Sequence, residues 1–297
     1  MTTARNVTVS GRLDARVERK LKPSLPLFHK VRILFAATLS AIALPASNAF
    51  AIDEIQVYNA GIADVDQWTL EEHLNYVARG RTQPDFPGAL ISDHSINGIP
   101  ELAYGVTEWW ELGLYAPFAF AQNGQGFADG AKLRTLFVSP HADKSEFFYG
   151  ANFEFSYSTP KFSQTRGGLE IRPIIGVRRD GFEFIVNPIV DVGFGRNGVA
   201  SFAPAVRLAR EIAKETWLGL EYYADFGQIG QFAPGAKQQH ALFAVTDFKL
   251  GPFDVNFGVG HGFTGGSDRL VFKAILGYAF PVSPQTALFR PIFERLR

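Results

Sequence analysis

The residues of this chain whose chemistry could form a catalytic or metal site are its six histidines and the hydroxyl side chains near them. No two histidines have the close spacing, such as His-x-x-x-His, that brings two ligands to one ion, so the sequence predicts no metal site. A hydrolase needs a nucleophile, a base and an orienting group. His94-Ser95, and His261 with Ser267, supply suitable types, but such residues are common in loops. We therefore expect no catalytic residues, no enzyme and no cofactor.

Charged residues recur within apolar segments, and their signs largely alternate from one segment to the next. Side chains point to alternate faces along a β-strand, so charges at one parity share a face. Opposite charges on adjacent strands can then pair across the sheet. We expect them to fill and stiffen the interior of a barrel, the alternative being a charge-selective pore. The predicted network consists of Glu71, Glu111, Lys132, Arg134, Glu154, Glu170, Arg172, Glu183, Asp191, Arg207, Glu221, Asp225, Asp254, Arg269 and Lys273.

Residues 147–157 show most clearly which kind of element positions these charges. The segment reads Phe-Phe-Tyr-Gly-Ala-Asn-Phe-Glu-Phe-Ser-Tyr, with aromatic residues at one parity and mostly small or polar residues at the other. It is long for a globular strand and fits a tilted crossing of a bilayer. Apolar residues of a membrane barrel face lipid, and polar residues face the lumen. Tyr149 is therefore expected outside and Glu154 inside, where Arg134 and Arg172 are its expected partners.

Twelve segments have the composition and length of barrel strands, and the connections between them alternate in length. Long connections on one side and short turns on the other are typical of outer-membrane barrels. An even number of strands puts both ends of the barrel on the short-turn side, which is expected to be periplasmic. The predicted strands are 68–78, 100–107, 109–119, 130–138, 146–157, 168–178, 181–192, 201–210, 216–226, 239–249, 252–262 and 269–280.

Some residues fit this arrangement poorly. Strand 239–249 is ambiguous, because facing His240 and Thr246 inward would turn Asp247 toward lipid. Prolines within strands cannot donate the ladder hydrogen bonds that a membrane requires. The prolines concerned are Pro173, Pro188 and Pro204.

The longest connection, after the first strand, has the composition of a stiff loop. Two prolines restrict its backbone, and Arg81 and Asp85 are spaced to pair with each other. Such a loop can fold into the mouth of a barrel as a constriction formed by Arg81, Asp85 and Phe86. A solvated external loop is the equal alternative.

The chain begins with a basic stretch and a short apolar run, which predict a cleaved signal peptide. Lys30 and Arg32 precede the apolar residues 33–45, which are too few to span a membrane as a helix. Ala49 and Ala51 form the small-x-small cleavage pattern. The expected parts are a signal peptide with an extended basic region (1–51), a periplasmic N-terminal segment (52–67), an outer-membrane β-barrel (68–280) and a periplasmic tail (281–297). Within the N-terminal segment, residues 55–62 are either another short strand or a periplasmic plug.

Composition excludes several other classes of protein. None of the 297 residues is cysteine, so neither a disulfide framework nor a thiolate metal site is available. The formal charge is zero overall, but residues 52–297 carry 21 Lys/Arg against 27 Asp/Glu. We therefore expect no nucleic-acid partner.

The first strands carry motifs that resemble a known group of proteins. Residues 74–77 read Leu-Asn-Tyr-Val, residues 80–88 read Gly-Arg-Thr-Gln-Pro-Asp-Phe-Pro-Gly, and residues 100–115 read Pro-Glu-Leu-Ala-Tyr-Gly-Val-Thr-Glu-Trp-Trp-Glu-Leu-Gly-Leu-Tyr. They resemble uncharacterised proteobacterial outer-membrane β-barrel proteins, which are loosely similar to the transporter family called phenol-degradation MetA-pathway proteins. The resemblance implies a barrel and passage of a small molecule, and it supplies no functional residues.

Together these patterns predict an all-β protein: an antiparallel transmembrane β-barrel of about twelve strands, exported behind a signal peptide to the outer membrane of a Gram-negative cell. The expected function is a channel or transporter-like passage for a small, apolar or aromatic, molecule. Membrane lipid and that solute are the expected partners. Two other functions stay open, a lipid-acting hydrolase and a closed structural or adhesive barrel.

Overall fold

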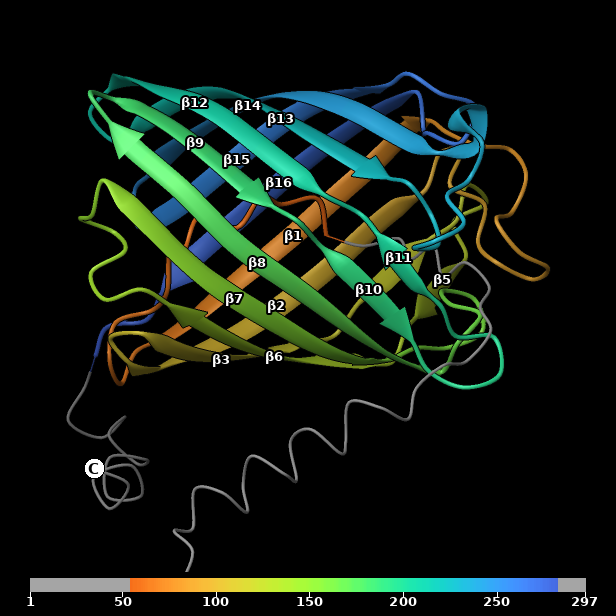
Figure 1. Cartoon of the computed structure of the whole chain (residues 1–297), viewed down its shortest axis with the longest axis horizontal. Coiled ribbons are helices and arrows are strands. Elements are labelled where there is room, and N and C mark those ends of the chain that lie inside the picture. Colours follow the sequence, from red (N-terminus) through yellow and green to blue (C-terminus); the bar gives the residue numbers. More distant parts are fainter. Residues whose placement is uncertain (1–53, 283–297) are drawn as a thin grey trace, which may run out of the picture. The chain divides into compact units, whose positions relative to one another are not determined.

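Residues 54–282 are the part of the chain that the computed structural model describes, and strands make up most of it (Figure 1). The cleavage site at Ala49 and Ala51 and residues 283–297 of the expected tail lie outside the described residues. No helix in the described part is long and apolar enough to cross a membrane. The strands are β1 (Trp68–Arg79), β2 (Ile96–Thr107), β3 (Trp110–Tyr115), β4 (Phe118–Phe120), β5 (Gly126–Ala128), β6 (Ala131–Val138), β7 (Phe147–Tyr157), β8 (Gly167–Arg179), β9 (Phe182–Asn187), β10 (Val190–Gly193), β11 (Ala200–Phe202), β12 (Ala205–Ala213), β13 (Thr216–Asp225), β14 (Gln239–Leu250), β15 (Phe253–Gly262) and β16 (Leu270–Ala279), with a short 3-10 helix, η1 (Gly235–Lys237).

These strands form one antiparallel sheet that closes on itself, because β1 pairs with both β16 and β2. Several crossings of the wall consist of two strand segments: β3 continues into β4, β5 into β6, β9 into β10 and β11 into β12. Counted as continuous crossings, the sixteen strands make twelve, as the sequence predicts. The all-β, antiparallel, closed barrel is therefore confirmed.

The connections also alternate in length as predicted. Two residues join β2 to β3, β8 to β9 and β14 to β15, whereas sixteen residues separate β1 from β2 at the opposite end. The turn between β8 and β9 uses Asp180 and Gly181, whose φ angles of 51° and 74° are both positive. Such a turn has the twist that matches a tight antiparallel hairpin. Both ends of the barrel, Trp68 and Ala279, lie at the short-turn end.

The prolines within predicted strands coincide with interruptions of the hydrogen-bond ladder. Pro188 and Pro204 lie in the breaks between β9 and β10 and between β11 and β12. Pro173 lies opposite the first break, between the part of β8 that pairs with β10 and the part that pairs with β9. Because the interruptions match on neighbouring strands, a few bonds between break residues still hold the wall together, including Ala203 N to Ile189 O at 3.0 Å.

The two faces of the sheet have the inverted polarity of a membrane barrel. On β7, Tyr149 and Phe155 are 55% and 50% exposed on the outside, whereas Asn152 and Glu154 are buried inside. The same alternation on the other long strands leaves large apolar side chains outward and buries carboxylates and guanidinium groups in the lumen. On β7 the two faces are thus as the sequence predicts, with aromatic residues outward and polar residues inward.

Two buried glycines let aromatic rings lie flat against the inner wall. Phe148 stands directly opposite Gly176, and Phe243 likewise stands opposite Gly260. A Cβ atom added to Gly176 would lie 2.1 Å from Cζ of Phe148, which is fully buried. Each ring therefore depends on the missing side chain of its cross-strand partner.

We predict that Gly176→Val destabilises the barrel by about 1–3 kcal/mol, because the added side chain overpacks the site of Phe148. The measurement is urea unfolding in detergent, followed by the band shift that folded barrels show in unheated electrophoresis. Gly235→Val in η1 is the matched control, since a Cβ there meets no atom within 4 Å. Equal unfolding midpoints of the two variants would contradict this account.

Candidate functional site

Residues 54–63, the lumenal segment, run inside the barrel and are held by side chains from opposing walls. Asn187 of β9 makes two hydrogen bonds with the Tyr58 backbone, at 2.7 and 3.1 Å. The carbonyl oxygens of residues 55 and 56 accept from Lys273 of β16 and Arg172 of β8. These bonds satisfy backbone groups that would otherwise be buried without partners. The expectation of a periplasmic segment over residues 52–67 is thus wrong for residues 54–63, which lie inside the lumen.

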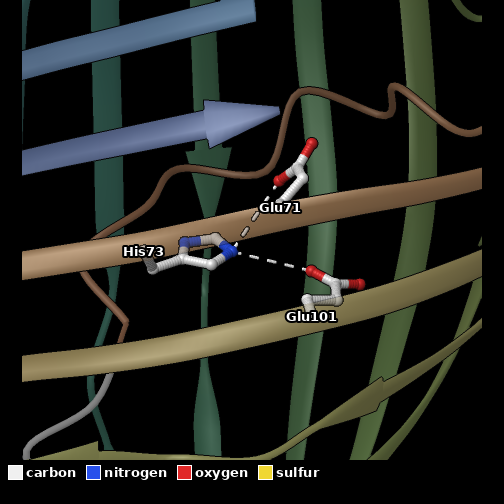
Figure 2. A group of neighbouring side chains, drawn as sticks. All are labelled: Glu71, His73 and Glu101. Atoms are coloured by element: carbon white, nitrogen blue, oxygen red, sulfur yellow. Dashed lines mark ion pairs between the residues drawn. The ribbon is translucent and has the colours of Figure 1, made fainter. Parts of the chain in front are cut away.

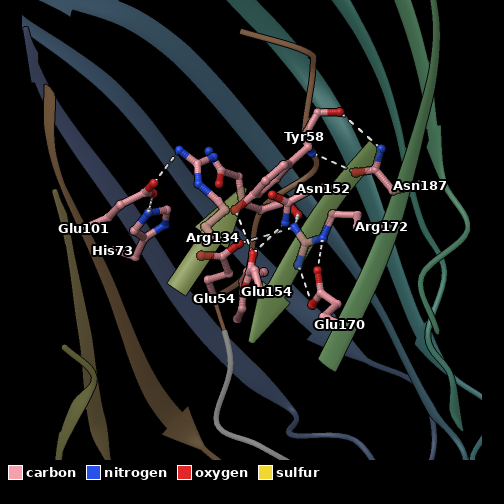
Figure 3. Close-up of polar contacts among 12 residues, drawn as sticks. Glu54, Tyr58, His73, Glu101, Arg134, Asn152, Glu154, Glu170, Arg172 and Asn187 are labelled. Atoms are coloured by element: carbon pink, nitrogen blue, oxygen red, sulfur yellow. Dashed lines mark hydrogen bonds and ion pairs between the residues drawn. The ribbon is translucent and has the colours of Figure 1, made fainter. Parts of the chain in front are cut away.

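The Tyr58 side chain makes most of the polar contacts between the lumenal segment and the wall around it (Figure 3). Its hydroxyl lies 2.8 Å from the hydroxyl of Tyr115 and donates to Oε1 of Glu154 at 3.1 Å. The guanidinium carbons of Arg172 and Arg134 lie 4.2 and 5.6 Å from the centre of its ring. A ring between two buried cations gains cation–π attraction, which is strongest where water is excluded.

Because Tyr58 occupies this position, the ion pairs expected for Glu154 do not form. Arg134 stands opposite Glu154 in the register, but it pairs with Glu101 and Glu111 instead. Arg172 pairs with Glu170 at 2.6 Å. The contacts of Glu154 are the Tyr58 hydroxyl, the Asn152 amide at 2.8 Å and the more distant Lys132 ammonium at 3.5 Å.

A second network joins the strands on the other side of the lumen. Arg207 of β12 contacts Glu183, Glu221 and Asp247, and Lys273 reaches Glu221 at 2.5 Å. Asp247 therefore faces the lumen, which decides the orientation that the sequence left ambiguous for strand 239–249. The ring of His240 instead bonds to the hydroxyl of Tyr222 at 2.6 Å.

Other members of the predicted network lie at its margins or outside it. Asp254 is exposed at the short-turn end and pairs with Lys249 at 2.6 Å. Arg269 is also exposed, in the connection that precedes β16, and its side chain donates to the Gly262 carbonyl. Asp225 accepts from the Gly227 backbone at the end of β13, and Asp191 lines a small cavity beside β10.

The prediction missed several lumenal residues. Two of them, His73 and Glu101, share the inward parity of residues already assigned to the lumen, so the period of two could have identified them. Tyr58 and Glu54 had no such signal, because they precede the first strand. The missed residues are Glu54, Tyr58, His73, Glu101 and Asp247.

The long loop between β1 and β2 folds over the mouth at the opposite end from the short turns. Oδ1 of Asp268 accepts hydrogen bonds from the backbone and side chain of Arg81 and from Ser92, at 2.9, 3.2 and 2.5 Å. Arg81 also pairs with Asp85, and Phe86 is buried. Burial raises the pKa of the Asp85 carboxyl above its usual range, and Arg81 opposes that shift.

The lumenal segment lies between two cavities of the lumen. A cavity of about 210 Å³ on the long-loop side is lined by Glu54 and Ile55 together with Asp85 of the loop. A cavity of about 520 Å³ on the short-turn side is lined by Gln56 and Val57. The barrel is thus constricted by the lumenal segment, and the loop between β1 and β2 forms part of the wall of the cavity on the long-loop side.

The residues considered for hydrolysis do not form a nucleophile–base pair. His94 Nδ1 lies 2.8 Å from Asp93, and the buried Ser95 hydroxyl donates to the Ser92 carbonyl. In the other loop the Ser267 hydroxyl donates to the backbone carbonyl of His240. Among the described residues, neither serine makes a hydrogen bond to a histidine ring.

No family model and no curated protein matches the chain. Among solved structures, the COG4313 outer membrane channel from Pseudomonas putida F1 is similar over 76% of this chain and 100% of its own, with a TM-score of 0.57 and 10% identity. LpxR from Salmonella typhimurium (TM-score 0.39, 11% identity, 71% of this chain and 99% of that one) is too distant to bear on the argument. The chain thus has the fold of an outer-membrane channel barrel, and identity this low establishes the fold alone.

We predict that Asp268→Ala releases the long loop, because three donors lose their common acceptor. Hydrogen bonds to a charged group contribute about 1.5–3 kcal/mol each, so trypsin cleavage after Arg81 should accelerate by roughly tenfold or more. The measurement is limited proteolysis of the folded protein in detergent. Asp143→Ala, at an exposed turn, is the control and should leave the rate unchanged. Equal rates in the two variants would show that Asp268 does not hold the loop.

Proposed function

We propose that this protein is an outer-membrane channel for a small molecule, apolar or aromatic, and that the lumenal segment sets the width of its pore. The observation that carries this proposal is the course of residues 54–63 between two cavities of the lumen. The segment is fixed by side-chain hydrogen bonds and not by strand pairing, so it can move without breaking the wall. Solute passage then requires only its displacement.

The outer face supports a location in a membrane. Large apolar side chains stand exposed around the wall, whereas charges of the same strands point inward. A soluble protein rarely exposes so much contiguous apolar surface. Outer-membrane lipid is therefore the proposed partner of this face, and the proposed route of export is a signal peptide cleaved after Ala51.

The lining of the cavity on the long-loop side supports the proposed class of solute. Tyr223, Phe243, Val77 and Val271 contribute apolar surface to the cavity of about 210 Å³ beneath the loop. A small aromatic molecule fits such a mixed surface, because its ring contacts the apolar part and its polar groups contact the rest. The resemblance to a transporter family supports the same class of solute.

We predict that Asn187→Ala raises solute flux, because it removes two hydrogen bonds that hold the lumenal segment. At about 0.5–1.5 kcal/mol each, their loss should increase the population of the displaced segment by about fivefold or more. Tyr58→Ala should act in the same direction. The measurement is conductance in planar bilayers together with liposome uptake of small aromatic molecules.

Two variants serve as controls for this experiment. Asn123→Ala in the loop between β4 and β5 and Tyr157→Ala on the outer face leave the lumenal segment untouched. Both should behave as the parent protein. Absence of flux in the parent, Asn187→Ala and Tyr58→Ala alike would reject the channel and favour a closed barrel.

A further inference from the structure

A cluster of three side chains on the inner wall has the composition and spacing of a metal site (Figure 2). Glu71 and His73 lie on β1, and Glu101 lies on the neighbouring β2. His73 Nε2 is 3.7 Å from Oε2 of Glu71 and 3.6 Å from Oε2 of Glu101. The three candidate ligand atoms all lie within 4.8 Å of one another.

The cluster carries an excess of negative charge. Glu71 and Glu101 stand directly opposite each other in the strand register, and like charges in such pairs repel. Arg134 contacts Glu101, but it is shared with Glu111. Three carboxylates therefore face one guanidinium, which leaves a net charge of −2 when His73 is neutral.

The network around Arg207 provides a contrast within the same lumen. There the carboxylates of Glu183, Glu221 and Asp247 face three cations, so the charges balance. The three cations are Arg178, Arg207 and Lys273. The excess at Glu71 and Glu101 is thus a property of that cluster and not of the whole lumen.

His73 supplies a second, independent observation. Its side chain is 1% exposed, and neither ring nitrogen has a hydrogen-bond partner among the described residues. A buried polar group without a partner costs about 1–3 kcal/mol, so native structures rarely keep one without a reason. Nε2 points between the two carboxylates, where a cation would be its natural partner.

We propose that Glu71 Oε2, His73 Nε2 and Glu101 Oε2 bind a divalent transition-metal ion. One imidazole and two carboxylates suit Zn²⁺ and its neighbours better than Ca²⁺ or Mg²⁺, which prefer oxygen ligands alone. Bond lengths of about 2.0–2.2 Å place tetrahedral ligand atoms about 3.4 Å apart, so the two histidine–carboxylate distances need to shorten by only a few tenths of an ångström.

The surroundings of the cluster favour this geometry. Arg134 engages Oε1 of Glu101 at 2.5 Å, which leaves Oε2 directed at His73. Partners of this kind orient the ligands of metal sites. Glu71 and Glu101 also line a cavity of about 310 Å³ that the lumenal segment borders, so water can complete the coordination. The site does not depend on the proposed channel function.

The test is isothermal titration calorimetry of the full mature chain in detergent, after removal of metals with EDTA, with Zn²⁺ as the probe. We expect one ion per chain, and we expect His73→Ala and Glu101→Gln each to weaken binding by roughly tenfold or more. His261→Ala, an exposed histidine on β15, is the control and should bind as the parent does. Heat-dependent migration in electrophoresis shows whether each variant is folded.

A second readout separates a metal site from a protonated His73 that acts only as a counter-ion. Zn²⁺ should raise the temperature at which the parent loses its folded band, since a ligand of the native state stabilises that state. It should not raise that of Glu71→Gln, whose half-exposed side chain makes misfolding a lesser concern. No Zn²⁺ binding by the parent, or equal affinity in His73→Ala, would overturn the proposal and assign the counter-ion role.

Discussion

The arrangement of the lumen depends on the contact between Tyr58 and the buried charges around it. Its ring lies against Arg172 and Arg134, and its hydroxyl bonds to Glu154. Arg134 stands directly opposite Glu154 in the strand register, and Arg172 stands opposite Asn152, two positions away. With the Tyr58 ring between them, each arginine pairs with other carboxylates. The position of a segment outside the sheet thereby determines which ion pairs form within it.

The wall is adapted to this interior in two ways. Matching breaks at prolines interrupt neighbouring strands without leaving one strand alone unpaired. Glycines such as Gly176 allow rings such as Phe148 to pack against the wall instead of projecting into the lumen. Phe148 belongs to the apolar cluster that also includes Val57 and Tyr58. The lumenal segment is thus held by apolar packing on one side and by charge on the other.

The fold could be predicted because period-two alternation is a local property of the chain. A segment such as 147–157 specifies its own inner and outer faces, and the alternation of turn and loop lengths specifies the direction of each strand. The assignment stayed open at β14, because Asp247 and Thr246 are adjacent polar residues and either could define the inner face. Only the partner on β12, Arg207, decides between them, and that contact spans forty positions of sequence.

By itself, the sequence determined the closed barrel, its number of crossings, and the outward face of strands with clear alternation such as β7, because these follow from alternation and turn length. Only the tertiary structure decided the partners within the lumen. Those depend on where residues 54–63 run, and no pattern in a segment without strand periodicity specifies a path through a barrel. The cluster of Glu71, His73 and Glu101 likewise arises from two strands in register, which the spacing of histidines along the chain could not reveal.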